Sequence, residues 1–481
     1  MFLDRRGSGG GRTVGDKSKL RKFFTRKNTI IAAWTVFFIL AAFLAYSFVS
    51  KNKQLMVIEA LNVASKISSL LPIEADEKKE LEVVNRLVQD ITKKDGVTRN
   101  FLVLLQNNME LRPGGGFLGQ YAIIKIKDGE AVSVFVEDAN LLDQKISAKI
   151  TPPYALQRMM QIRKWKFRDS NFSPDFPTNV DKAEYFLRLA GSQSKFDGVV
   201  AVNSQVFNDI LEITGPVSAP GSSVVFDSSN AALKLEEIVE KPYLMDENLD
   251  TQNRKWIMKK LAPVIIGKLS NAGDLPKLAE FFHNELKNKN IMLNFSDPEL
   301  QRSVESVAWD GKVAADWQGD YLMMVDANMG ALKTDYFMRR SMEYGLDLTG
   351  EKPVATLNIL YKNTAPYGDW RTSDYHSYLR VYVPAGAKLL ENKMVSPIGG
   401  TVDEFGKTAF GFMLHTLIGQ ETAAMIKYEL PVNFSTDEYK LLIQKQSGVG
   451  DLPVKIRIKS KEGEFDQESV LKGDLEFQMK K

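Results

Sequence analysis

The 481-residue chain contains no cysteine and only three histidines. It therefore has no disulfide, no thiolate nucleophile and no cysteine-based metal site. The histidines (His283, His376 and His415) lie far apart and form no HExxH pair, so the sequence does not indicate a zinc hydrolase. It also has no GxSxG nucleophile elbow and no Walker A phosphate loop. These absences exclude several common classes of hydrolase and nucleotide-binding enzyme.

An excess of one charge is also missing. The sequence has 63 basic and 60 acidic residues, for a net charge of +3. Nucleic-acid-binding domains usually carry a clear basic excess, so we expect no nucleic-acid partner. The hydrophobic fraction of 44% and the charged fraction of 26% are typical of globular proteins. The length predicts two or three folding units.

One uncharged run, residues 30–49 (IIAAWTVFFILAAFLAYSFV), is ~30 Å long as a helix, enough to cross a bilayer. Nine lysines and arginines precede it within residues 1–27. Basic flanks stay in the cytoplasm, so we predict a cytoplasmic tail at 1–27 and a single transmembrane helix at 28–50. The remainder then lies outside the cytoplasm of a bacterium, attached to the cell membrane. A signal peptide cleaved near Ala45-Tyr46-Ser47 is the alternative, but the length of the run and the following Lys51 and Lys53 favour an anchor.

Beyond the anchor, the hydrophobic patterns predict an α+β, multi-domain protein. Residues 51–95 show helical spacing interrupted by Pro72, which predicts a helical hairpin or stalk. Short apolar runs alternate with helical segments over 96–349, which predicts an α/β domain with helical insertions. Among these runs we predict a hairpin around Lys127-Asp128-Gly129 and a strand in DYLMMVDANMG (320–330). Residues 350–481 contain about seven short runs with turn residues between them: VATLNILYKN, SYLRVYVPAG, KTAFGFMLHT, TAAMIKYELP, YKLLIQKQ, VKIRIKS and DLEFQMK. These runs predict an antiparallel, immunoglobulin-like β-sandwich.

The segment QNNMELRPGGGFLG (106–119) directly follows a predicted buried strand. Ligands of α/β sheets bind beyond the carboxyl ends of strands, and glycine backbone can approach a ligand closely. The segment therefore predicts an anion-binding or phosphate-binding loop. In the alternative reading, the glycines satisfy tight geometry and Arg112 pairs with Glu110 or another carboxylate. The candidate ligand-binding residues are Asn107, Asn108, Glu110, Arg112, Gly114, Gly115 and Gly116.

A second polar loop, FRDSNFSPDFP (167–177), adds Arg168 and Asp169 as candidate ligand-binding residues. Asp175 in this loop and Asp138 at the end of the preceding hairpin are candidate metal ligands, because divalent cations prefer hard oxygen donors. Turn formation and helix capping are the alternative roles for these residues.

Three segments in order resemble the bacterial family known as domain of unknown function 4012: NNMELRPGGGFLG, RDSNFSPDFPTNVDKAEYF and FDGVVAVNSQVFNDILEITGPV. DYLMMVDANMGALKTD and YKLLIQKQSG are also similar to that family, so the resemblance covers most of residues 55–470. Members typically carry one N-terminal membrane anchor, but the family has no assigned activity.

The order of strands and polar loops is also similar to the LytR–CpsA–Psr phosphotransferases. These membrane-anchored enzymes move glycopolymers from polyprenyl pyrophosphate to the cell wall. The similarity implies that Arg112 binds pyrophosphate, that Arg168 or Asp169 matches the second Arg-Asp element of that family, and that Asp138 binds Mg²⁺. The sequence has Glu110-Leu111-Arg112 and Phe167-Arg168-Asp169 where that family has RSD and PRD.

Two functions remain open from the sequence. The first is a surface binding or structural protein of the cell envelope, with cell-wall glycan or envelope proteins as partners. The second is a transferase of glycopolymer or lipid-linked phosphate that would use Mg²⁺. A single span cannot line a pore alone, which argues against a solute transporter.

Overall fold

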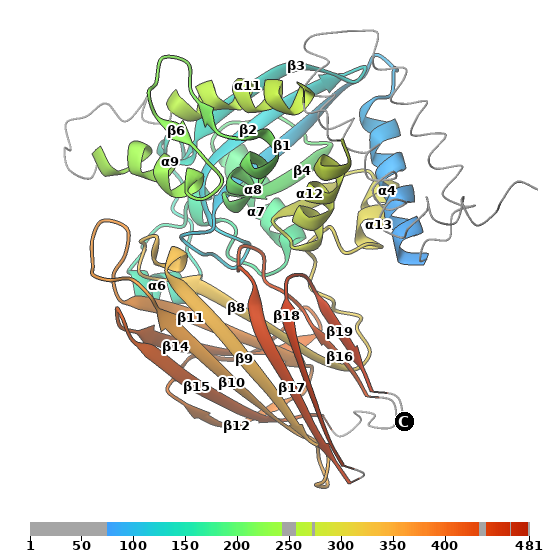
Figure 1. Cartoon of the computed structure of the whole chain (residues 1–481), viewed down its shortest axis with the longest axis vertical. Coiled ribbons are helices and arrows are strands. Elements are labelled where there is room, and N and C mark those ends of the chain that lie inside the picture. The colour runs from blue at the N-terminus through green and yellow to red at the C-terminus, as the bar shows by residue number, and fades with distance from the viewer. Residues whose placement is uncertain (1–74, 243–255, 272–274, 432–438, 462, 480–481) are drawn as a thin grey trace, which may run out of the picture.

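The computed structural model describes residues 75–242, 256–271, 275–431, 439–461 and 463–479. Helices and a small sheet form an upper α/β part, and a large β-sandwich lies below it (Figure 1). Within these ranges no helix is both long and apolar enough to cross a membrane. The predicted tail at 1–27, the transmembrane helix at 28–50 and the first stalk helix lie outside the described residues.

The α/β part is built on a five-stranded mixed sheet in the order β3-β2-β1-β4-β7. Central strand β1 pairs antiparallel with β2 and parallel with β4. The edge strands β3 and β7 pair antiparallel with β2 and β4. The strands are β1 (Thr98–Asn107), β2 (Phe117–Lys127), β3 (Glu130–Asp138), β4 (Gly198–Asn203) and β7 (Ile291–Phe295).

Alternate residues of β1 enter two different cores. Phe101 packs in one hydrophobic cluster, while Leu102 and Leu104 pack in another on the opposite face. The first face is covered by α4 (Ala75–Ile91), α8 (Gln205–Thr214), α9 (Ala231–Val239), α11 (Trp256–Asn271), α12 (Leu275–Lys287) and α13 (Pro298–Glu305). The second is covered by α5 (Ala139–Lys145), the 3-10 turn η1 (Phe167–Asp169) and α7 (Phe176–Leu189). Further elements are α6 (Tyr154–Met160) and the short strands β5 (Val217–Ser218) and β6 (Val225–Phe226).

Helix α4 packs on the α/β part. We predicted it as part of a stalk, but Val84, Leu87 and Val88 are buried in the same cluster as Phe101 and Val304. The apolar positions three and four residues apart form one face of the helix, and that face covers the sheet.

The sandwich consists of two six-stranded sheets, β12-β15-β10-β9-β17-β18 and β13-β14-β11-β8-β16-β19, with one buried cluster between them. Their alternating patterns are clear, as in β10, where Leu357, Ile359 and Tyr361 are buried between exposed neighbours. The strands are β8 (Asp320–Asn328), β9 (Met338–Asp347), β10 (Val354–Asn363), β11 (Tyr375–Pro384), β12 (Lys388–Lys393), β13 (Ser396–Glu404), β14 (Lys407–Thr416), β15 (Glu421–Glu429), β16 (Lys440–Ile443), β17 (Leu452–Ser460), β18 (Gly463–Leu471) and β19 (Leu475–Gln478). The 3-10 turn η3 (Thr334–Tyr336) joins β8 to β9.

The sandwich begins earlier than the boundary that we predicted at residue 350. Strands β8 and β9 had been assigned to the α/β domain, yet each lies inside one sheet of the sandwich. They pair parallel with β16 and β17, so the sheets are not the seven antiparallel strands of the predicted immunoglobulin-like arrangement. We did not predict β12, β13 and β18, which lie at sheet edges. There a strand tolerates the proline and two glycines of SPIGGTVDE in β13.

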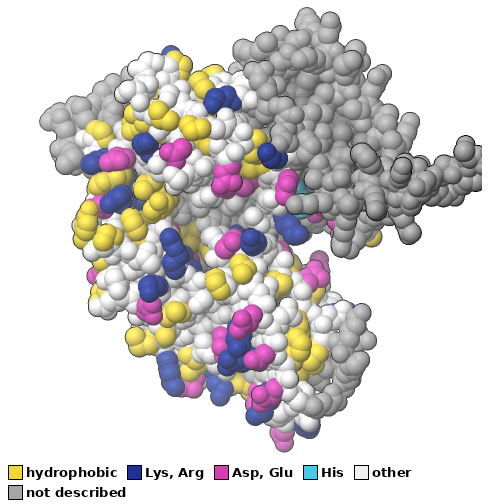
Figure 2. All heavy atoms as spheres, in the orientation of Figure 1, with side chains coloured by type: hydrophobic (Ala, Val, Ile, Leu, Met, Phe, Trp, Pro, Cys, Tyr) yellow, Lys and Arg dark blue, Asp and Glu magenta, His cyan; other side chains and the backbone are white. Residues whose placement is uncertain are grey.

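Basic and acidic side chains are interspersed on the face drawn in Figure 2, over both parts of the molecule. This distribution matches the near balance of charge in the sequence.

The two parts meet where residues 444–448 of the sandwich pack against the β1–β2 loop. The Gln446 side chain accepts a hydrogen bond from Asp326 N, and its Nε2 donates to the carbonyls of Asp326 (2.8 Å) and Arg112 (3.1 Å). Ser447 Oγ donates to the carbonyl of Lys289 (2.6 Å). Gly448 has φ +82°, and a Cβ there would lie 1.8 Å from the carbonyl oxygen of Gly115. This junction therefore requires glycine at position 448.

We expect Gly448→Ala to lower the free energy of unfolding by about 2 kcal/mol or more, because it combines a left-handed backbone with a steric overlap. Urea unfolding of the full chain in detergent measures the change. Gly450→Ala is the matched control, since a Cβ there meets no atom within 4 Å. Equal unfolding midpoints for the two variants would show that the junction tolerates a side chain.

Candidate ligand-binding site

Arg112 is buried at the junction, with 1% of its surface exposed. Its Nη2 lies 2.9 Å from Glu110 Oε1, and its Nε lies 3.3 Å from Asp169 Oδ1. Nη1 donates to the carbonyls of Leu111 and Asn328. Burial raises the pKa of Glu110, and the nearby guanidinium opposes that shift. These contacts correspond to the alternative left open by the sequence, in which Arg112 pairs with Glu110.

The three loop glycines allow protein segments to pack closely together. A Cβ on Gly114 would lie 2.5 Å from Asn179 Nδ2, one on Gly115 2.7 Å from Ser447 Oγ, and one on Gly116 2.4 Å from the Asn107 backbone. The adjacent amides make bonds inside the protein. Asn107 Oδ1 accepts from Met109 N, while Asn108 donates to Gly448 O and accepts from Ser204 Oγ.

The two candidate metal ligands cap helices. Asp138 accepts from Asn140 N at the start of α5. Asp175 Oδ2 accepts from Thr178 N at the start of α7, and its Oδ1 accepts from Val313 N. Arg168 bonds Asn140 and lies 3.7 Å from Asp143. Across the described ranges, no group of three histidine or acidic residues is arranged to hold a metal ion.

The structure therefore brings Glu110, Arg112 and Asp169 together in one buried cluster, whereas Asp138 and Asp175 sit at the starts of two different helices. The ligand-binding and metal-binding roles of all these residues stay predictions.

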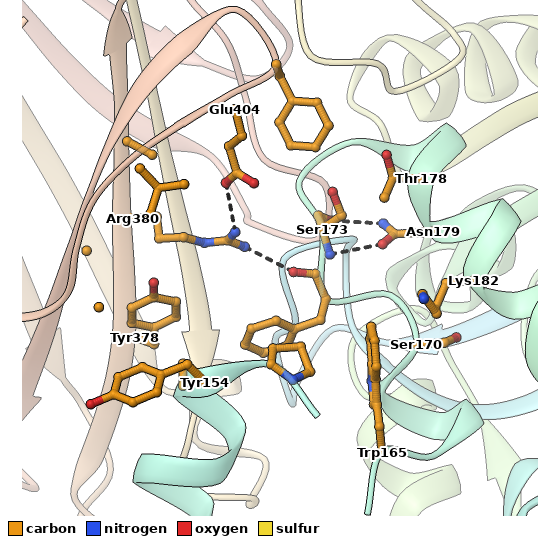
Figure 3. A pocket seen from close by; sticks show the side chains of 18 of the residues that line it. Tyr154, Trp165, Ser170, Ser173, Thr178, Asn179, Lys182, Tyr378, Arg380 and Glu404 are labelled. Atoms are coloured by element: carbon orange, nitrogen blue, oxygen red, sulfur yellow. Dashed lines mark hydrogen bonds and ion pairs between the residues drawn. The ribbon is translucent and has the colours of Figure 1, made fainter. Parts of the chain in front are cut away.

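A cavity of about 560 Å³ opens between the α/β part and the sandwich. One wall comes from α6, the segment that leads through Trp165 and Ser173, and the first turns of α7. The other comes from β11, β13 and β14 (Figure 3). Its volume falls in the range of small-molecule sites. We refer to it as the interdomain pocket.

Five aromatic residues are among those that line the interdomain pocket. Trp165 and Phe172 line it from the α/β side, and Tyr378 and Phe405 line it from the sandwich. The Phe172 and Tyr378 rings are stacked across the junction, 6.4 Å apart with an interplanar angle of 1°. Tyr154 lines the rim and is 58% exposed.

Polar side chains also line the pocket, and Figure 3 shows them on both walls. Arg380 donates from Nη2 to the carbonyl of Phe172 (3.1 Å), and its Nη1 lies 3.4 Å from Glu404 Oε1. The Lys182 ammonium lies 4.7 Å from the centre of the Trp165 ring. The Tyr378 hydroxyl has no hydrogen-bond partner among the described residues, so it is available to a ligand.

The sequence located one wall of this pocket only in part. The predicted loop 167–177 does line it, but through Ser170, Phe172 and Ser173, and not through Arg168 or Asp169. The sandwich wall was missed, because its residues come from three strands and form no local motif. The tryptophan of QIRKWKFRD was the available signal, since aromatic residues are depleted in ordinary surface loops.

The comparisons with known proteins bear on the α/β part. Residues 96–239 match the family described as "Protein of unknown function (DUF4012)", which confirms the predicted resemblance over that stretch. The matched residues run from the start of β1 to the end of α9. They include the α/β wall of the interdomain pocket but none of its sandwich wall. The similarity to the phosphotransferases stays a prediction.

Among solved structures, the protein Lin1025 from Listeria innocua is similar, with 11% sequence identity and a TM-score of 0.23. The alignment covers 44% of this chain and 79% of that chain. No protein with a curated description matches the sequence.

We expect Arg112→Ala to lower the free energy of unfolding by about 3–5 kcal/mol, because it leaves two buried carboxylates without their cation. Urea unfolding of the full chain measures the loss. Arg158→Ala, at an exposed position of α6, should change stability by less than about 0.5 kcal/mol. An Arg112→Ala protein with unchanged stability that no longer bound polyprenyl pyrophosphate would contradict the structural role and support the phosphotransferase similarity.

Proposed function

We propose that this chain is a membrane-anchored binding protein of the bacterial cell envelope, and that its ligand is a glycan held in the interdomain pocket. The observation that carries this proposal is the composition of the pocket walls, which contain five aromatic residues together with hydrogen-bonding side chains.

A sugar ring fits these walls chemically. Its C–H faces are apolar and stack on aromatic rings, while its hydroxyls need donors and acceptors around the edge. Trp165 and Phe405 supply ring surface from the two sides of the pocket. Glu404 supplies an acceptor for the sugar edge, and Tyr378 supplies a hydroxyl that has no partner in the part of the chain that the structure describes.

The cellular location rests on the sequence. The uncharged run at residues 30–49 and the nine basic residues before it favour an anchor with the folded part outside the cytoplasm. A glycan of the cell wall would then lie within reach of the interdomain pocket.

Transfer of lipid-linked glycopolymer is the second function that the sequence left open. It would require the Arg112 guanidinium to reach a pyrophosphate, and 1% of that residue is exposed. The contacts of Arg112 with Glu110 and Asp169 favour binding without transfer over this alternative.

A large side chain placed in the interdomain pocket should weaken glycan binding. Val402 lines it from β13 and is 47% exposed, so Val402→Trp adds a large ring without entering the core. We expect soluble peptidoglycan strands to bind the wild-type full chain in detergent and to lose at least tenfold in affinity with this variant, by isothermal titration calorimetry. Tyr367→Trp is the control, because Tyr367 is 62% exposed and does not line the pocket. Equal affinity in all three proteins would place the glycan elsewhere.

Removing the free hydroxyl tests the polar part of the pocket separately. Tyr378→Phe keeps the ring and breaks no hydrogen bond within the described residues, so stability should stay within about 0.5 kcal/mol. Affinity for the same strands should fall about 2–10-fold, the effect of one neutral hydrogen bond. The same titration with Tyr367→Phe should give the wild-type value. Unchanged affinity in Tyr378→Phe would remove this hydroxyl from the site.

A further inference from the structure

We propose that the interdomain pocket selects sugars that carry an anionic substituent, a carboxylate or a phosphate, and that Lys182 is the residue that binds it. This inference rests on the proposed function, because it names the ligand class of the same pocket.

The charged residues that line the interdomain pocket leave a positive excess. Two of them are cations, Lys182 and Arg380, and one is an anion, Glu404, so their sum is +1. A neutral sugar needs no such excess, whereas an anionic sugar is held more strongly by it.

The excess positive charge comes from Lys182, because the charge of Arg380 is already paired with a carboxylate. The Arg380 guanidinium lies 3.4 Å from Glu404, and Tyr382 also donates to that carboxylate. The rings of Phe172, Tyr378 and Tyr382 surround Arg380 with centres 5.6–5.7 Å away. Arg380 therefore holds the two walls together and is poorly placed to take a further anion.

Lys182, by contrast, has no carboxylate partner among the described residues. Its ammonium lies between two rings, 4.7 Å from the centre of Trp165 and 5.1 Å from that of Tyr185. Figure 3 places Lys182 and Trp165 on the wall opposite Arg380. A sugar stacked against this wall would bring its substituent within reach of an ammonium that is still free to pair.

The chain around this wall adds further positive charge. Residues 154–168, from α6 into η1, contain five basic residues and no acidic residue (Arg158, Arg163, Lys164, Lys166 and Arg168). The next residue, Asp169, is paired with Arg112. Burial lowers the pKa of Lys166, and the neighbouring Arg168 lowers it further. This field attracts an anion toward the pocket and repels a cation.

Two pairs of sugars that differ in charge test the inference. Trigalacturonate and its methyl ester have the same three sugar rings and differ in the charge of their carboxyl groups. Glucose 6-phosphate and glucose have the same single ring and differ by the phosphate. We expect the full chain in detergent to bind each acidic sugar about tenfold more tightly than its neutral counterpart, the effect of one charge-assisted hydrogen bond. Calorimetric titration at 50 mM and at 500 mM NaCl should show the difference shrink with salt. Preference in the first pair alone identifies a carboxylate, and preference in the second alone identifies a phosphate.

Lys182→Gln should abolish the preference while retaining binding of the neutral sugar, because the aromatic walls remain. Lys125→Gln, at an exposed position of β2 away from the pocket, should keep the preference. Equal affinity for acidic and neutral sugars in the wild type would overturn the selectivity and leave the glycan site standing. If none of these sugars bound, and peptidoglycan strands did not bind either, the proposal of a glycan site itself would be wrong.

Discussion

The buried guanidinium of Arg112 constrains the rest of the structure. A charge removed from water must be paired, and this one is paired with carboxylates from two segments and with the backbone of a third. Asp169 belongs to η1 and Asn328 ends β8, so a single side chain joins the α/β part to the sandwich. The loop glycines follow from this arrangement, because the segments must approach closely enough for the guanidinium to reach all of its partners.

The same cluster determines where the walls of the interdomain pocket lie. Ser170 and Phe172 follow Asp169 directly, so the Arg112–Asp169 pair holds the segment that forms one wall. On the other side, Ala327 of β8 lies opposite Tyr378 of β11, which forms the second wall. A pocket whose walls are fixed in this way needs little reordering on binding, and less of the interaction energy is then lost to conformational entropy.

Local patterns predicted the elements of this fold better than their assembly. The hairpin around Lys127-Asp128-Gly129 is present, with positive φ at Asp128 and Gly129 as its tight turn requires. The strand at 320–328 was also predicted, but its apolar sequence is compatible with a place in the α/β sheet or in the sandwich. Only its pairing with β11 and β16 assigns it to the sandwich. Such pairing depends on residues far along the chain, and no local window contains it.

The candidate site was harder to predict for a related reason. A loop rich in arginine, acid and glycine has the same composition whether it binds a ligand or closes a buried junction, since both require satisfied charge and close backbone approach. Burial bears on this choice, and it is a property of the assembled parts: Arg112 is enclosed where the β1–β2 loop meets Asp169 and the end of β8. Conversely, Trp165, Tyr378 and Glu404 are unremarkable one by one. They acquire a shared chemistry only where the two parts meet, so the junction that encloses Arg112 also forms the pocket beside it.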